Sequence, residues 1–128
     1  MCYLKGMENK EIRDLQNNGY FVGIIDGAKC VDLRSSIAHI ASAFKFPDYY
    51  GENLDAFDEC INDLEWLTES NYAIVIENSN LLMVEDTKDN KLYLINLLDD
   101  VSSEWSGASN NKIDDPSKRK ADFKVIYN

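Results

Sequence analysis

Hydrophobic residues along the chain occur either in short continuous runs or in stripes with helical spacing. Apolar runs predict buried strands over residues 20–26, 72–77 and 123–127. Apolar stripes with steps of three and four predict helices over about residues 8–17, 32–45, 53–67 and 89–105. The pattern also admits a short strand near residues 29–31 and one helical turn within 79–84. Because strands alternate with helices, this order favours one α/β domain with a largely parallel sheet.

Turn and capping residues mark where several of these elements begin and end. Asp26-Gly27 predicts a turn after the first strand, and Asp32 can cap the helix that follows. Pro47 disfavours continuation of that helix, and Asn53 can cap the next one. The predicted buried side of the helix over 53–67 consists of Leu54, Phe57, Ile61 and Leu64, with Cys60 beside them.

Composition limits the class of protein. The chain has 128 residues, 45% of them hydrophobic, which fits one domain with a modest core. The cysteines, Cys2, Cys30 and Cys60, match no zinc-binding spacing. The first residues lack the apolar run of a signal peptide, and no stretch is long enough to span a bilayer. We therefore expect a cytoplasmic protein with reduced thiols, no metal site and no cofactor.

Charge is distributed unevenly along the chain. The formal net charge is -10, yet eleven of the 23 acidic residues lie between Lys45 and Lys88, where no Lys or Arg occurs. The remaining acids nearly balance the 13 basic residues. This distribution argues against direct nucleic-acid binding and favours a basic protein partner, of which nucleases are a common kind. A solvated acidic surface that only aids solubility is the alternative.

The run FPDYYGENLDAFDECINDL at residues 46–64 resembles the central motif of the barstar family of ribonuclease inhibitors. Shared features are a Pro, an acid, two aromatics, a Gly, an Asn, and a helix that starts apolar-Asp-Ala-apolar. The resemblance covers residues 20–128, so residues 1–19 are interpreted as an N-terminal extension and the polar stretch of about 106–120 as a loop. It implies a single layer of three parallel strands flanked by helices.

The resemblance also implies a function and a binding face. It implies an inhibitor or immunity protein that binds and occludes the basic active site of a guanyl-preferring, barnase-like ribonuclease. Tyr49 matches the tyrosine that packs on a catalytic histidine of the enzyme, Asp55 an acid that faces its basic residues, and Glu59 the acid that occupies its phosphate site. The remaining predicted contact residues are Asp58, Asn62, Asp63 and Glu104, with Asp100 as a second candidate beside Glu104. We expect no catalytic activity, and a monomer when the protein is free.

Departures from the family motif keep other functions open. The family member that inhibits barnase has Asp at the position of Glu59, Trp at that of Asp58, and small or aromatic residues at 62–64. A barstar-like module that binds another nuclease toxin, or a protein that is not a nuclease, is therefore the main alternative. A hydrolase that uses Asp55, Asp58 and Glu59 as paired carboxylates or as Mg²⁺ ligands is disfavoured. The chain has no Gly-rich phosphate loop and no nucleophile motif, and its one histidine, His39, lies within a predicted helix.

Overall fold

Three parallel strands form one sheet in the order β1-β2-β3, in a computed structural model that describes residues 9–47, 53–107 and 120–128. The strands are β1 (Tyr20–Asp26), β2 (Asn71–Glu77) and β3 (Phe123–Tyr127). The helices are α1 (Asn9–Asn17), α2 (Leu33–Ala43), α3 (Leu54–Ile61), the single 3-10 turn η1 (Ser79–Leu81) and α4 (Lys88–Ser106). Both crossovers between neighbouring strands are helical, as parallel pairing requires. The predicted α/β fold with three parallel strands is confirmed.

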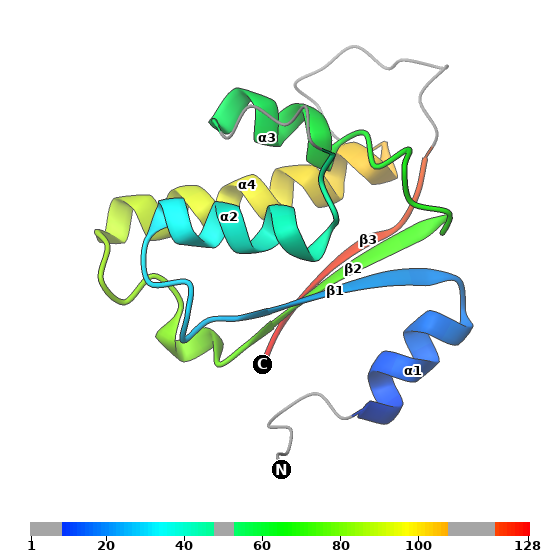
Figure 1. Ribbon diagram of the computed structural model, residues 1–128, viewed down its shortest axis with the longest axis horizontal. Coiled ribbons are helices and arrows are strands. Elements are labelled where there is room, and N and C mark those ends of the chain that lie inside the picture. The colour runs from blue at the N-terminus through cyan, green and yellow to red at the C-terminus, as the bar shows by residue number, and fades with distance from the viewer. Residues whose placement is uncertain (1–8, 48–52, 108–119) are drawn as a thin grey trace.

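The helices form layers on both faces of the sheet. α2 and α4 lie over one face, α3 lies above them on the side away from the sheet, and α1 lies against the opposite face (Figure 1). The central strand β2 is covered on both sides, so the side chains from Tyr72 to Ile76 are all buried. Among the described residues, no helix is both long and apolar enough to cross a membrane.

α1 closes the second face of the sheet. Its Ile12 is 7% exposed and packs against Val75 of β2, and Leu15 packs on the same small cluster. Val22 of β1 and Ile126 of β3 complete this cluster, so it joins residues of α1 with residues of all three strands. The sequence analysis interprets residues 1–19 as an N-terminal extension of the family domain. The described part of this extension nevertheless packs into the hydrophobic core on one face of the sheet.

The opposite face is organised around Phe44, at the end of α2. Its ring is fully buried and packs 5.3 Å from the ring of Phe21 and 5.8 Å from that of Phe123. Gly23 leaves room for the Phe44 ring, because a Cβ atom at residue 23 would lie only 2.5 Å from that ring. The glycine in the apolar run of β1 therefore serves the close approach of an aromatic side chain.

Asp86 links the start of α2 to the start of α4. One carboxylate oxygen accepts a 2.8 Å hydrogen bond from the backbone N–H of Leu33, and the other accepts from the backbone of Thr87 and the side chain of Asn90. Asp32, as predicted, caps α2 by accepting from the backbone N–H of Ser35. Donation to the Asp86 carboxylate, first by Leu33, holds its pKa below the usual 3.8.

Three predictions about local structure are wrong. Residues 29–31 form a turn and an irregular segment instead of a strand. The helix predicted over 53–67 ends at Ile61, because the chain turns at Asn62 and Leu64 adopts a left-handed backbone conformation with φ of 51°. Leu64 is nevertheless fully buried, since the turn also directs it inward. Leu54, predicted to be buried, is 40% exposed at the first residue of α3, beyond the edge of the core.

Replacing Ile12 with Ala should lower the free energy of unfolding by about 2–3 kcal/mol, because it leaves a cavity between α1 and β2. Gln16→Ala, at an exposed position of the same helix, should change it by less than about 0.5 kcal/mol. Urea unfolding of the full chain measures both. Equal effects would show that α1 does not pack on the sheet in solution.

Asp86→Asn should destabilise the protein in a pH-dependent way. Because the folded pKa of Asp86 lies below its unfolded value of 3.8, its stabilisation is complete above that pH and is lost as the pH falls through the folded pKa. The difference in unfolding free energy between the native chain and Asp86→Asn should therefore shrink below about pH 4. Urea unfolding at several pH values measures it, with the exposed Asp89→Asn as the matched control. A difference that stays constant down to about pH 2 would contradict the role given to Asp86.

Candidate protein-binding site

The predicted binding acids lie on α3, a short helix with a defined start. The side-chain oxygen of Asn53 accepts a 2.8 Å hydrogen bond from the backbone N–H of Ala56, as predicted for a cap. Asp55 and Glu59 are both exposed and lie four residues apart, so their carboxylates project from the same side of the helix. The helix thus presents two acids to solvent one turn apart.

The end of α3 carries the next three predicted contact residues. Asp58 and Asn62 are half-buried, and the Asn62 amide donates to the Asp58 carboxylate at 3.2 Å and to its backbone carbonyl at 3.0 Å. This pairing holds both side chains in one orientation. Asp63 follows directly and is exposed. These residues, Asp55, Asp58, Glu59, Asn62 and Asp63, together form what we call the acidic face. It continues from α3 into the turn that ends the helix.

Two indole groups hold α3 against its neighbours. Trp105 of α4 is 2% exposed, and its Nε1–H donates to the backbone carbonyl of Ile61 at 3.0 Å. Trp66, in the segment after α3, donates from its Nε1–H to the carbonyl of Phe44 at 2.9 Å. The sequence alone does not show whether either tryptophan lies in the core or at an interface. Trp105 satisfies a carbonyl at the end of α3 that the helix itself leaves without a donor.

The same contact brings the last turn of α4 beside the end of α3. Glu104, which immediately precedes Trp105, is half-buried there, while Asp100 is exposed one turn earlier. Of the two late acids, Glu104 is the one next to the residue that contacts α3. We retain Glu104 as the predicted contact on this ground.

The acidic residues of α3 lie partly where they disfavour the helix. α3 has Asp55 in its first turn, where an acid complements the helix dipole, but no basic residue in its last turn. Asp58 and Glu59 lie toward its carboxyl end, where negative charge is unfavourable. Burial chiefly, and then the charges of Asp63 and Glu59, raise the pKa of the Cys60 thiol. This thiol is buried and stays protonated at neutral pH, so it is a poor nucleophile.

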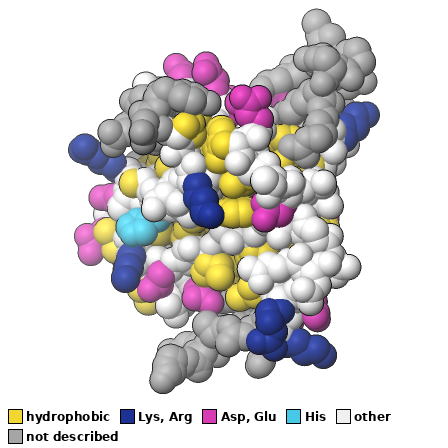
Figure 2. Space-filling view, turned by 45° about the vertical axis from the view of Figure 1, so that its right-hand side comes forward, with side chains coloured by type: hydrophobic (Ala, Val, Ile, Leu, Met, Phe, Trp, Pro, Cys, Tyr) yellow, Lys and Arg dark blue, Asp and Glu magenta, His cyan; other side chains and the backbone are white. Residues whose placement is uncertain are grey.

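Acidic side chains are visible at the top of the molecule in Figure 2, at the height that α3 has in Figure 1. Hydrophobic side chains are visible just below them. Leu54, exposed next to Asp55, adds an apolar group to this face that the sequence analysis assigned to the core. Its position directly after the helix cap was the signal that could have revealed it, since first-turn residues often extend beyond the core.

The remaining predictions concern Tyr49 and metal binding. Tyr49 lies outside the described residues, so its predicted contact stays a prediction. Among the residues that the structure describes, no three His, Cys, Asp or Glu side chains form a group suited to hold a metal ion. Asp55, Asp58 and Glu59 therefore form no such group. His39 is half-buried in α2, with Nδ1 2.8 Å from the carbonyl oxygen of Ser35.

Residues 20–128 match the family model described as Barstar (barnase inhibitor). The chain belongs to the barstar family. The matched range contains the whole sheet, α2, α3 and α4, and leaves out α1. A comparison with curated proteins found no match. The barstar-family assignment thus covers every element that positions the acidic face.

Trp105→Phe should lower the free energy of unfolding by about 1–3 kcal/mol, because the buried carbonyl of Ile61 loses its donor while the ring is largely kept. Trp66→Phe should cost less, since Trp66 is half-buried and water can reach its acceptor more easily. Chemical unfolding of both variants measures the difference. A larger loss for Trp66→Phe would contradict the assignment of Trp105 as the main attachment of α3.

Proposed function

We propose that this protein is an inhibitor of the immunity-protein type, which binds and occludes the basic active site of a guanyl-preferring, barnase-like ribonuclease. The observation that carries the proposal is the exposed pair Asp55 and Glu59 on a capped helix, in a chain of the barstar family. The proposed contact surface is completed by Tyr49, Asp58, Asn62, Asp63 and Glu104. Such a protein would act in the cytoplasm and would be a monomer when it is not bound to its target.

The chemistry of this face suits a phosphate-binding pocket. A ribonuclease holds phosphate with Arg, Lys and His side chains, and a carboxylate can accept the same charge-assisted hydrogen bonds. Asp55 and Glu59 project together from a helix that Asn53, Trp105 and neighbouring side chains hold in place. Little side-chain and backbone freedom is then lost on docking. Barnase and barstar are themselves the standard example of charge-steered association, so fast encounter is expected from the family.

The placement of Glu59 supports a binding role over a structural one. A carboxylate near the carboxyl end of a helix, one turn from another acid, disfavours the helix by a few tenths of a kcal/mol. No salt bridge to Glu59 is recorded within the described part of the chain. A basic partner would turn this unfavourable charge into a favourable one.

A second candidate is a barstar-like module whose partner is another nuclease toxin or a protein that is not a nuclease. The pairing of Asp58 with Asn62 favours it, because this polar pair stands where the barnase inhibitor has Trp and a small or aromatic residue. A partner must then offer hydrogen-bonding groups in place of an apolar surface. Both candidates share the acidic face and differ in the target.

The proposal is tested by mixing the purified chain with guanyl-preferring ribonucleases and with any nuclease-like product encoded beside it, and following RNA cleavage at low salt. Glu59→Gln should weaken inhibition by about 3 kcal/mol of binding free energy, because a basic group in the enzyme loses its charged partner. The same variant should leave the free energy of unfolding unchanged or raise it by about 0.3 kcal/mol.

Glu11→Gln is the matched control, since Glu11 is exposed in the first turn of α1 on the other side of the sheet. It should leave inhibition unchanged. Tyr49→Ala should weaken inhibition as strongly as Glu59→Gln does. Absence of inhibition and binding for every nuclease tested would reject the inhibitor role, and equal effects of Glu59→Gln and Glu11→Gln would show that the face is misplaced.

A further inference from the structure

The outer edge of β3 presents backbone groups that β2 does not use. Tyr72 donates from its N–H to the carbonyl of Asp122, and Asn128 donates to the carbonyl of Ile76. In a parallel ladder this means that the even-numbered residues of β3 bond to β2. The N–H and C=O groups of the odd-numbered residues, such as Val125 and Tyr127, therefore point away from the sheet. One of these groups, the carbonyl of Phe123, accepts a 2.7 Å hydrogen bond from the Ser102 hydroxyl.

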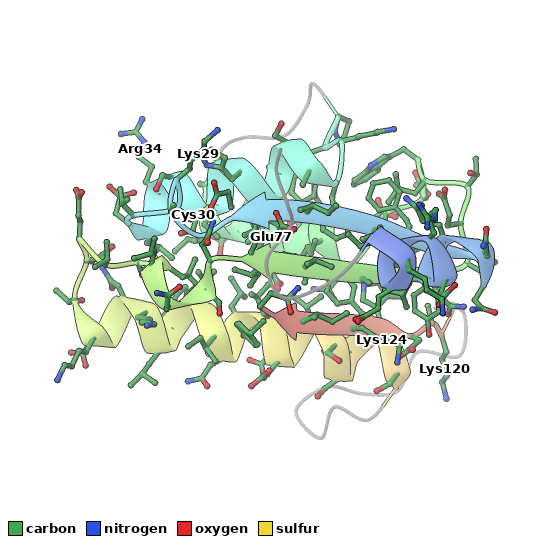
Figure 3. All side chains as sticks on the ribbon, turned by 90° about the horizontal axis from the view of Figure 1, so that it is seen from below. Lys29, Cys30, Arg34, Glu77, Lys120 and Lys124 are labelled. Carbon is green, nitrogen blue, oxygen red and sulfur yellow. The ribbon has the colours of Figure 1, made fainter. Side chains whose placement is uncertain are left out.

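A groove runs along this edge. Its volume is about 440 Å³, and it is lined by Asp99 and Ser102 of α4 and by residues 122–126. Seen from below, α4 runs alongside the outer edge of β3 (Figure 3). Val125 is half-buried and Tyr127 is 42% exposed, so apolar surface accompanies the outward backbone groups. An extended segment could lie beside β3 with α4 beneath it.

Charge indicates what such a segment would carry. Lys124, a residue of β3 labelled in Figure 3, is paired with Asp122 at 3.3 Å. For Asp99, which is exposed, no salt bridge is recorded among the described residues. Within the part of the chain that the structure describes, the groove thus has one acid that no cation pairs with, and the net charge of the whole chain is -10. A basic segment complements this groove, whereas a second copy of the chain would be repelled.

We propose that the outer edge of β3 binds an extended, Lys- or Arg-bearing segment of a partner protein, which adds to the sheet as a fourth strand. Backbone hydrogen bonds to Val125 and Tyr127 provide the affinity, as in other strand-addition complexes, and Asp99 selects a basic side chain. β3 has five residues, so the segment is about that long. This site is separate from α3, which lies beyond α2 and α4 (Figure 1), and does not depend on nuclease inhibition.

The test uses the ¹⁵N-labelled full chain and an acetylated, amidated heptapeptide of alternating Lys and Val. The peptide should shift the backbone amide signals of Val125 and Tyr127. At a free concentration ten times Kd it should slow their hydrogen exchange by about tenfold, because only the unbound fraction exchanges. The amides of Lys124 and Ile126, already bonded to β2, should change far less. Asp99→Asn should weaken binding roughly two- to fivefold, and the exposed Asp89→Asn should not.

Two further peptides decide the outcome. A version N-methylated at alternate residues loses the donors that would reach β3 and should not bind, and a Glu-Val version should bind far more weakly than the Lys-Val peptide. No change at Val125 and Tyr127 with the Lys-Val peptide would overturn the proposal. So would equal binding of the Glu-Val peptide, or the same signal changes when only the protein concentration is raised, which would identify a second copy as the occupant.

Discussion

The burial of β2 on both faces is the constraint on which the rest of the structure depends. Its side chains from Tyr72 to Ile76 are inaccessible to water, so each face of the sheet needs a cover. The crossover helices α2 and α4 cover one face, and α1 covers the other through Ile12. With both faces occupied, α3 can pack only outside α2 and α4, and one side of it faces solvent. The acidic face is therefore a consequence of how the sheet is closed.

α3 is held in place by its surroundings more than by its own sequence. Eight residues are too few for a stable isolated helix, and the acids toward its carboxyl end weaken it further. The side chain of Asn53 accepts a hydrogen bond from a backbone N–H of the first turn, and Trp105 donates one to the backbone carbonyl of the last residue. These contacts stabilise a helix that would not be stable alone. The exposed positions, Asp55 and Glu59 among them, are then free to serve a partner. A helix of this kind is held rigidly by the core while its charged side chains remain exposed.

The two proposed contact surfaces use different chemistry. On α3, side-chain carboxylates project from a helix, and recognition would depend on salt and on the partner's basic groups. At β3, backbone groups face outward, and recognition would depend on an extended partner segment. Both surfaces are acidic, and the helix layer separates them (Figure 1). Each can therefore be altered by substitution without disturbing the other.

The sequence by itself determined the three strands, the α/β class, the capping residues Asp32 and Asn53, and the family through its central motif. These follow from local patterns, because continuous apolar runs and caps act within a few residues. Only the tertiary structure decided that α3 ends at Ile61, that Leu54 is exposed, and that Trp105 reaches the end of α3. A helical stripe cannot show where the chain turns or which neighbour lies opposite, because those depend on contacts between elements distant in sequence.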